Sequence, residues 1–350
     1  MSAAPDGRRA LALATSVGSV ALSNPVLTAS GTSGHGTELS EYGRLADLGA
    51  VVVKSLSVEP WPGNPAPRVH EVSAGMLNSV GLQGPGLAAW VTDDLPALGD
   101  AGARVVVSIW GRSVSDYARA AELVAVAASS PAGSCIDALE VNVSCPNVED
   151  RSRMFAHSAE ATARVLEATA CGVPRWAKLS PNVPDLVEIA AGAVEGGADG
   201  VTLVNTLLGL ALDTESGLPV LGAGGGGLSG GAVHPVAVRA VWECRSAFPE
   251  VPIVGVGGVF SGHDAVELLL AGADAVQVGT ATFRDPRAPW KVLRQLARWC
   301  EIHSTTVGGI RNAVRQRVGA GAGGAPRGVS GGPVATGAAV LSQQEGGQHG

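Results

Sequence analysis

The sequence of 350 residues contains little of several residue types, and each shortage excludes a class of protein. Its five cysteines are an odd number in a long chain, which argues against a disulfide-stapled scaffold. They include no Cys-x-x-Cys pair, which argues against a self-contained zinc or iron–sulfur site. The 24 lysines and arginines are outnumbered by 31 aspartates and glutamates, so the chain offers no basic surface to nucleic acid. No apolar run reaches about 18 residues, so the sequence predicts no membrane-spanning helix.

The residues that are present indicate one large globular domain or two small ones. Hydrophobic residues make up 46% of the chain and charged residues only 16%, which is too apolar for a disordered protein. Residues 8–21 place two arginines before an apolar stretch, as a signal peptide does. Small polar residues interrupt that stretch, so we favour a β-hairpin that leads into the fold, and a cytoplasmic chain.

Short valine-rich runs alternate with longer helical patterns along most of the chain. Several runs lack polar alternation, as parallel strands buried on both faces do. The expected strands are residues 26–30, 51–54, 104–109, 138–143, 175–179, 200–205, 252–256 and 273–278. The expected helices lie near residues 37–48, 86–98, 115–129, 158–171, 184–196, 233–247, 262–271 and 286–302.

Eight strand–helix units predict an α/β protein with a (β/α)8 TIM-barrel fold, and a doubly wound open sheet is the alternative. We place the barrel at residues 24–304, after an N-terminal segment and hairpin at residues 1–23. Residues 305–350 form a tail rich in glycine and alanine, which such a composition predicts to be disordered.

Three long connections follow strands, at residues 55–85, 144–157 and 206–232, where the loops of a barrel build the active face. The last of them ends in GAGGGGLSGG, a flexible stretch suited to a lid or to close backbone approach. Ser115, Ser158 and Ser261 are placed as N-caps of the helices that follow them, or just outside those helices.

Two glycine-containing turns lie after the last two strands and before helices. They are Val254–Gly258 and Val278–Thr280. Glycine lets the backbone approach a phosphate closely, and these two loops are the usual phosphate site of such barrels. We therefore expect a phosphate-binding site for a substrate or a cofactor, and simple tight turns are the alternative.

The stretch Leu139–Asn147 ends a strand and then places Cys145 in a loop stiffened by Pro146. A cysteine on the active face can act as a base or a nucleophile, and the alternative is a small buried apolar residue. We assign that alternative to the other cysteines, which are Cys135, Cys171, Cys244 and Cys300.

Two lysines and four asparagines lie at the ends of the predicted strands or after them. The basic residues are almost all arginine, but Lys54 and Lys178 each follow an apolar run directly. Four asparagines, each able to donate and accept hydrogen bonds, fall after strands or at their ends. They are Asn78, Asn142, Asn147 and Asn205. Together they can bind a ring of alternating N–H and C=O groups, such as a pyrimidine.

These residues resemble the class 1 dihydroorotate dehydrogenases, most closely subclass 1B. The matching stretches, colinear from residue 28 to residue 281, are TASG (28–31), GNPAPR (63–68), GMLNSVGLQGPG (75–86), LEVNVSCPN (139–147), KLSPN (178–182), NTLLG (205–209), GGLSG (226–230), GVGG (255–258) and VGTA (278–281). The motifs GMLNSVGLQ and NVSCPN are specific, whereas the glycine pairs alone are weak.

The resemblance implies a flavin-dependent barrel that oxidises (S)-dihydroorotate to orotate in pyrimidine (UMP) biosynthesis. Cys145 would remove the C5 proton while hydride passes from C6 to FMN. The substrate would be held by Lys54, Asn78, Ser79, Val80, Gly81, Leu82, Asn142, Asn147, Asn205 and Thr206. FMN would be held by Ser30, Lys54, Ser55, Ser108, Asn142, Lys178, Val204, Gly230, Gly257, Gly258, Gly279 and Thr280.

Subclass 1B further implies a homodimeric core and a partner subunit that carries FAD and a [2Fe–2S] cluster and passes electrons to NAD. The sequence departs from the family at Ser108, where an asparagine is usual, at Trp110, at Glu149–Arg153, where glycines are usual, and at Gly224–Gly227. The alternatives are a class 1A-like enzyme that uses fumarate, an FMN barrel that acts on another pyrimidine-like substrate, a flavin-free phosphate-binding lyase or isomerase, and a non-catalytic binding barrel.

Overall fold

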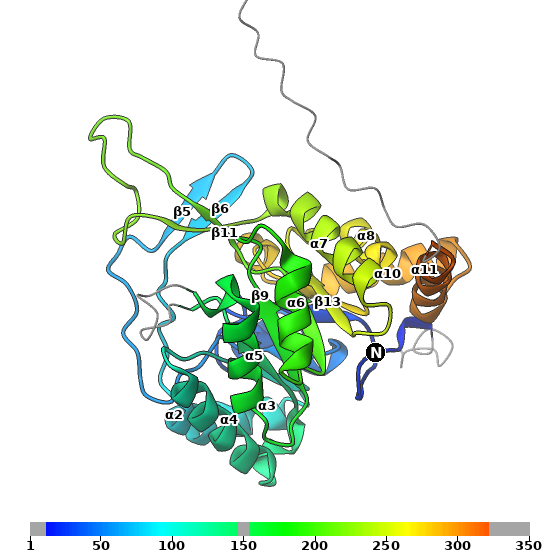
Figure 1. Ribbon diagram of the computed structural model, residues 1–350, viewed down its shortest axis with the longest axis horizontal. Coiled ribbons are helices and arrows are strands. Elements are labelled where there is room, and N and C mark those ends of the chain that lie inside the picture. Colours follow the sequence, from blue (N-terminus) through cyan, green and yellow to red (C-terminus); the bar gives the residue numbers. More distant parts are fainter. Residues whose placement is uncertain (1–11, 146–153, 322–350) are drawn as a thin grey trace, which may run out of the picture.

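A closed parallel barrel forms the body of the molecule (Figure 1). The structure is a computed structural model that describes residues 12–145 and 154–321. Eight strands pair in the order β3–β14–β13–β10–β9–β8–β7–β4, and a parallel bridge between Leu27 and Ala50 joins the two ends of that order. The strands are β3 (Val26–Thr28), β4 (Val51–Val52), β7 (Val105–Ile109), β8 (Ile136–Asn142), β9 (Arg175–Leu179), β10 (Gly200–Leu203), β13 (Ile253–Val256) and β14 (Ala275–Val278). The predicted TIM barrel is confirmed.

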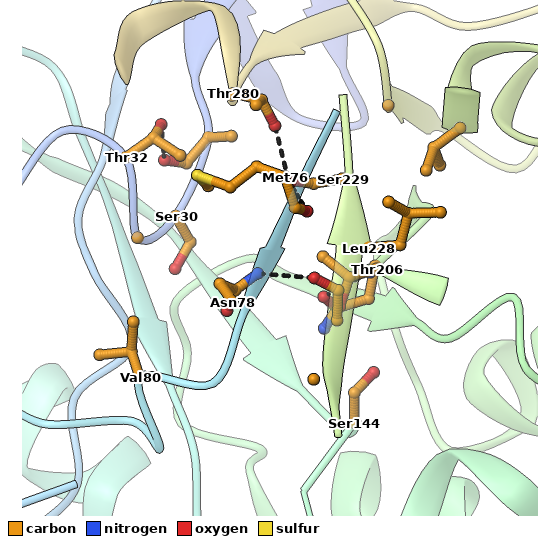
Figure 2. A pocket seen from close by; sticks show the side chains of 18 of the residues that line it. Ser30, Thr32, Met76, Asn78, Val80, Ser144, Thr206, Leu228, Ser229 and Thr280 are labelled. Carbon is orange, nitrogen blue, oxygen red and sulfur yellow. Dashed lines mark hydrogen bonds between the residues drawn. The ribbon is translucent and has the colours of Figure 1, made fainter. Parts of the chain in front are cut away.

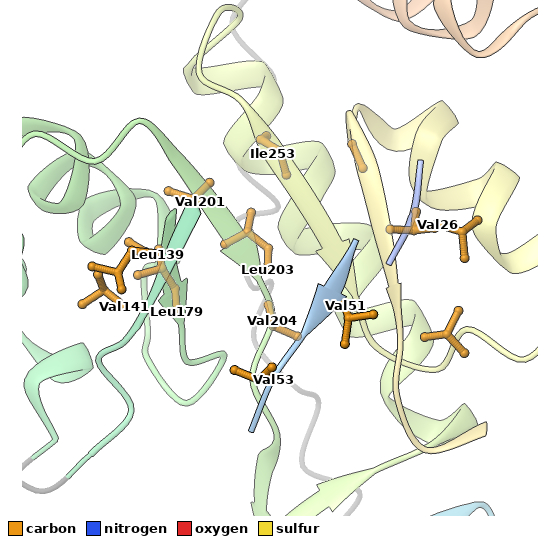
Figure 3. Close-up of a cluster of buried hydrophobic side chains, with 14 of the residues drawn as sticks. Val26, Val51, Val53, Leu139, Val141, Leu179, Val201, Leu203, Val204 and Ile253 are labelled. Carbon is orange, nitrogen blue, oxygen red and sulfur yellow. The ribbon is translucent and has the colours of Figure 1, made fainter. Parts of the chain in front are cut away.

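The side chains of each strand alternate between the inside of the barrel and the surrounding helices. Val51 and Val53 pack in the large cluster between sheet and helices (Figure 3), whereas Val52 packs in a smaller inner cluster. By the same alternation, Leu139 and Val141 face the helices, so Glu140 between them faces the barrel interior. Polar residues in these buried strands are therefore aimed inward.

The N-terminal hairpin seals the amino-terminal end of the barrel. It consists of β1 (Thr15–Val17) and β2 (Val20–Leu22), and the predicted hairpin is confirmed. Val17, Val20 and Leu22 belong to the inner cluster, so this end is filled with apolar side chains. The opposite end, where the strands terminate, is left for a binding site.

The helices of the outer layer are α2 (Leu87–Asp93), α3 (Leu95–Asp100), α4 (Val114–Ala128), α5 (Ala159–Ala168), α6 (Leu186–Glu195), α7 (His234–Ala247), α8 (Gly262–Ala271), α9 (Ala281–Arg284) and α10 (Ala288–Ile302). The helix expected at residues 37–48 is instead two 3₁₀ turns, Glu38–Glu41 and Leu45–Asp47. Ser158 and Ser261 cap their helices as expected, but Ser115 lies inside α4 and Ser113 is its N-cap. Within the described residues, no helix has the length and apolarity needed to cross a membrane.

A second sheet stands over the open end of the barrel. Its strands are β5 (Val69–Val72), β6 (Gly75–Asn78), β11 (Leu207–Gly209) and β12 (Gly226–Ser229), paired antiparallel in the order β11–β12–β6–β5. Of the two roles expected for the glycine run, a flexible lid is wrong for Gly226–Ser229, which is a central strand, and close backbone approach is confirmed there. A Cβ on Gly226 would lie 2.4 Å from the Asn78 carbonyl oxygen, so glycine serves close packing there.

The range expected as a tail begins with an ordered helix, α11 (Val307–Gly321), which packs against α8. Val307, Ile310 and Val314 are buried in that contact, and Arg311 forms an ion pair with Asp274. The folded unit therefore extends past residue 304. The rest of the range, residues 322–350, lies outside the described residues.

Candidate functional site

A cavity of about 850 Å³ lies between the ends of the barrel strands and the second sheet. Figure 2 shows part of its lining, with Asn78 from β6 and Ser229 from β12 on one side and Ser30 and Thr280 from barrel loops on another. The size and placement are those of a small-molecule or cofactor site.

Most of the residues predicted as site residues line this cavity. They are Ser30, Lys54, Ser55, Asn78, Ser79, Val80, Gly81, Leu82, Asn142, Lys178, Val204, Asn205, Thr206, Gly230, Gly257, Gly258, Gly279 and Thr280. Ser108 and Cys145 do not line it, and Asn147 lies outside the described residues. The folded chain thus brings the motifs of nine separate loops and strands to one place.

The charge of the lining favours an anionic ligand. Among its described residues, Lys54 and Lys178 are the charged side chains, and there is no aspartate or glutamate. Lys54 has no ion pair with a described residue, and burial lowers the pKa of its ammonium group. An anionic group bound beside Lys54 would stabilise the charged form and relieve that cost.

The predicted amides are held in place by one another. Asn205 donates from Nδ2 to Asn142 Oδ1 at 3.2 Å, and Asn142 donates from Nδ2 to Ser55 Oγ at 3.3 Å. Asn78 donates from Nδ2 to the Gly227 carbonyl at 3.1 Å, which ties β6 to β12. These contacts fix each amide plane and leave part of its hydrogen-bonding capacity for a ligand.

Asn182 is a site residue that sequence reasoning missed. Its Nδ2 donates to the Thr206 carbonyl at 2.9 Å, and its Oδ1 accepts from the Leu208 backbone at 2.8 Å. It therefore anchors the chain between the barrel and β11. The sequence signal was present, because Asn182 closes the KLSPN stretch directly after a strand.

Ser108 lies one step behind the cavity wall. Its hydroxyl shares a hydrogen bond with Ser55 Oγ at 2.8 Å, and Ser55 Oγ shares another with Ser30 Oγ at 3.2 Å. Because Ser108 is fully buried, it reaches a ligand only through Ser55. The neighbouring Trp110 packs edge-on against Trp61, with ring centroids 5.7 Å apart.

Three glycines with positive φ form a cradle between the second sheet and the barrel. Gly230, Gly257 and Gly258 have φ of 105°, 140° and 64°. A Cβ on Gly258 would lie 2.6 Å from His234 Cβ, and His234 Nδ1 lies 2.8 Å from the Gly257 carbonyl oxygen. Only glycine permits this backbone path, which leaves room at the wall for a bulky group such as a phosphate.

Thr280 and Ser229 connect the second glycine-containing turn, Val278–Thr280, to the glycine cradle. Their hydroxyl groups share a hydrogen bond of 2.8 Å, drawn as a dashed line in Figure 2. Thr280 follows β14 and Ser229 ends β12, so this bond links the barrel to the sheet above it. Thr280 is the donor in this bond, and Ser229 donates in turn to the Met76 carbonyl at 3.4 Å, so either hydroxyl has to turn away from its acceptor to bind an anion.

Cys145 is buried away from the cavity, contrary to the expectation that its sulfur faces the substrate. Its Sγ donates to the Asn142 carbonyl at 3.5 Å, and the Tyr117 hydroxyl donates to the same carbonyl at 2.6 Å. Burial raises the pKa of the thiol to about 12, and the neighbouring Tyr117 hydroxyl opposes that rise. Ser144 lines the cavity instead, and its buried Oγ has no partner among the described residues. In this conformation Cys145 is a protonated thiol.

The chain is similar in sequence to the members of one known protein family. A family model described as dihydroorotate dehydrogenase matches residues 12–299. A protein of Alkaliphilus oremlandii named dihydroorotate dehydrogenase B (NAD(+)), catalytic subunit, is 46% identical over 290 residues, which is 82% of this chain and 93% of the relative. Proteins of the same name from Bacteroides thetaiotaomicron and Geobacter sulfurreducens are 41% and 42% identical, over 83% and 82% of this chain and 94% and 92% of theirs.

Proposed function

The chain belongs to the dihydroorotate dehydrogenase family, and from that premise we propose that it oxidises (S)-dihydroorotate to orotate in pyrimidine biosynthesis. The observation that carries the proposal is the lining of the cavity, in which two lysines, a set of fixed amides and a glycine cradle occur together without a carboxylate. A carboxylate-bearing pyrimidine and a phosphate-bearing flavin both fit such a lining.

FMN is the proposed cofactor, since members of the family are flavin-dependent and the cavity has the matching donors. Gly257, Gly258, Gly279 and Thr280 would surround its phosphate, and a Cβ at Gly257 or Gly258 would collide with a neighbouring residue. Ser30, Ser55 and Val204 would contact the ring system, with Lys178 at the edge where negative charge develops. When bound, FMN supplies the acceptor for the hydride that leaves C6 of the substrate.

Lys54 is the proposed partner of the substrate carboxylate, because it is the cavity cation that forms no ion pair with a carboxylate in residues 12–145 and 154–321. Asn78, Asn142, Asn205 and Thr206 would read the N–H and C=O groups of the pyrimidine ring. Residues 79–82, directly after β6, also line the cavity and would cover the substrate.

Cys145 remains the proposed base for the C5 proton, and its geometry sets a condition on that role. The thiol is turned toward Asn142 and Tyr117, so its sulfur has to rotate toward the cavity and lose its proton before it can accept one from C5. Leaving the buried position removes the desolvation that keeps the thiol protonated. Lys54 and Lys178 would favour the thiolate in the cavity.

We further propose that a second subunit takes the electrons. The relatives carry the words catalytic subunit in their names, and subclass 1B implies a partner with FAD and a [2Fe–2S] cluster that reduces NAD, around a homodimeric core. The purified chain alone should reduce an artificial acceptor such as a dye with dihydroorotate but leave NAD unreduced. NAD reduction by the chain alone would contradict the need for a partner.

A cavity lysine, Lys54, and a surface lysine, Lys291, allow a matched test of the carboxylate site. Lys54→Met should weaken orotate binding about ten- to hundredfold, since a hydrogen bond to a charged group contributes about 1.5–3 kcal/mol. Lys291→Met is the control, because Lys291 pairs with Asp285 on the surface, away from the cavity. Binding is measured from the change in the flavin spectrum on titration with orotate. Equal affinities in the two variants would contradict the assignment of Lys54.

A further inference from the structure

Behind the cavity wall, Lys178 belongs to a buried triad whose other members reach no ligand directly. Its Nζ lies 3.2 Å from Glu140 Oε1 and 3.4 Å from Gln277 Oε1. Gln277 in turn donates from Nε2 to Glu140 Oε2 at 2.7 Å, which closes the ring of contacts. Glu140 and Gln277 are fully buried, whereas Lys178 lines the cavity.

The triad lies inside the barrel, where β8, β9 and β14 aim alternate residues inward. The layer beneath it is apolar and contains Ala138, Trp176 and Ala275, the inward residues two positions earlier on the same strands. The ion pair is therefore isolated from water on one side and open to the cavity on the other. Charges in such a setting interact more strongly than they do in water.

The two cavity lysines therefore differ in electrostatic character. Lys54 faces the cavity and has no counter-ion among the described residues, whereas the charge of Lys178 is offset by Glu140. A buried ion pair contributes little to stability compared with apolar residues of the same volume, so stability alone does not account for this one. Because Glu140 lies directly behind Lys178, its position points to an effect on the electrostatic potential that Lys178 presents to the cavity.

We propose that Glu140, positioned by Gln277, is the counter-ion that sets how strongly Lys178 favours the reduced flavin. This proposal rests on the proposed function, in which FMN binds beside Lys178. Glu140 contacts neither cofactor nor substrate and is a positioning residue. With the carboxylate present, the pair is neutral before reduction and Lys178 stabilises the added negative charge only in part, because Glu140 opposes it.

The test is the midpoint potential of the bound flavin in the purified holoprotein, measured by anaerobic titration against a reference dye. Glu140→Gln keeps the shape and removes the negative charge, so the reduced flavin should be favoured at least tenfold more. For a two-electron couple that ratio corresponds to a rise of about 30 mV. Glu140→Asp draws the carboxylate back from Lys178 and should raise the midpoint potential by a smaller amount. This variant tests the proposal if Glu140→Gln fails to bind flavin.

Two controls separate charge from packing. Gln277→Met disrupts the triad but keeps its charges, so its potential should stay closer to wild type than that of Glu140→Gln. Asp274→Asn removes the carboxylate of another buried ion pair, formed with Arg245, which does not line the cavity, and should leave the potential unchanged. A Glu140→Gln potential equal to or below wild type, in a protein that still binds flavin, would overturn the proposal. A wild-type protein that binds no FMN would instead overturn the proposed function.

Discussion

Gly258 offers a direct test of the glycine cradle. The variant Gly258→Ala places a methyl group at φ +64°, 2.6 Å from His234 Cβ and 2.9 Å from the His234 backbone nitrogen. The first contact is about 0.8 Å closer than the 3.4 Å at which ordinary contact begins. His234 starts α7 and its ring bonds the Gly257 carbonyl, so the neighbour cannot move without shifting the cradle itself.

The size of the effect follows from hydrogen-bond geometry. Donor–acceptor distances of about 2.7–3.2 Å define a good N–H···O bond, and a shift near 0.8 Å carries a backbone donor out of that range. A lost bond to a charged phosphate corresponds to about 1.5–3 kcal/mol, or roughly ten- to hundredfold weaker FMN binding. A positive φ costs a residue with a Cβ a further 1–2 kcal/mol or so of folding free energy.

Gly172→Ala is the matched control. Gly172 has φ of +81° in the turn before β9, and a Cβ there would meet nothing within 4 Å. Gly172→Ala therefore adds the free-energy cost of a positive φ without a steric collision, and Gly172 does not line the cavity. Both variants should be destabilised in urea, but only Gly258→Ala should bind FMN more weakly when titrated by fluorescence. Unchanged FMN affinity in Gly258→Ala, or an equal loss in Gly172→Ala, would refute this account of the cradle.

Two further predictions concern Cys145 and Asp274. Burial raises the pKa of Cys145 to about 12, so the thiolate fraction, and with it the rate of flavin reduction by dihydroorotate, should rise with pH across the neutral range. Cys145→Ser should lower that rate about 10²–10⁴-fold in stopped-flow experiments, and a loss below about threefold would end its candidacy as the base. Asp274→Ala should lower the free energy of unfolding by about 3–5 kcal/mol in urea titrations, because the buried Arg245 and the partly buried Arg311 then lose their ion pairs with it. Glu243→Ala at the exposed pair with Arg239 should change it little. Equal effects of these two substitutions would contradict the burial argument.

The barrel was predictable because eight short apolar runs, most of them rich in valine, and the helices between them each repeat the same local signal. The second sheet was not, since its central strand Gly226–Ser229 is held by close backbone contact with β6. Glycine has low strand propensity, so only the tertiary contact reveals why it is there. Helix α11 was missed for a similar reason, because its glycines and alanines concealed Val307, Ile310 and Val314.

Most of the residues that the sequence predicted as site residues line the candidate site, but the sequence did not predict the orientation of Cys145 or the role proposed for Glu140. Residues that follow strands, such as Lys54 and Asn205, were found because parallel strands all end at one edge of the barrel. The rotation of Cys145 toward Tyr117 depends on contacts between elements far apart in the sequence and was not predictable. Glu140 did carry a signal that was not used, since a carboxylate at alternate spacing from Asn142 in a buried strand has to face the barrel interior.

The most direct test of the central claim is the anaerobic addition of (S)-dihydroorotate to the purified protein while its absorption spectrum is recorded. The account predicts that the protein carries FMN, that the flavin bands bleach in a single turnover, and that orotate is formed in an amount equal to the flavin reduced. Flavin bands that persist in the presence of dihydroorotate, or a heat-released cofactor that is FAD, would contradict it.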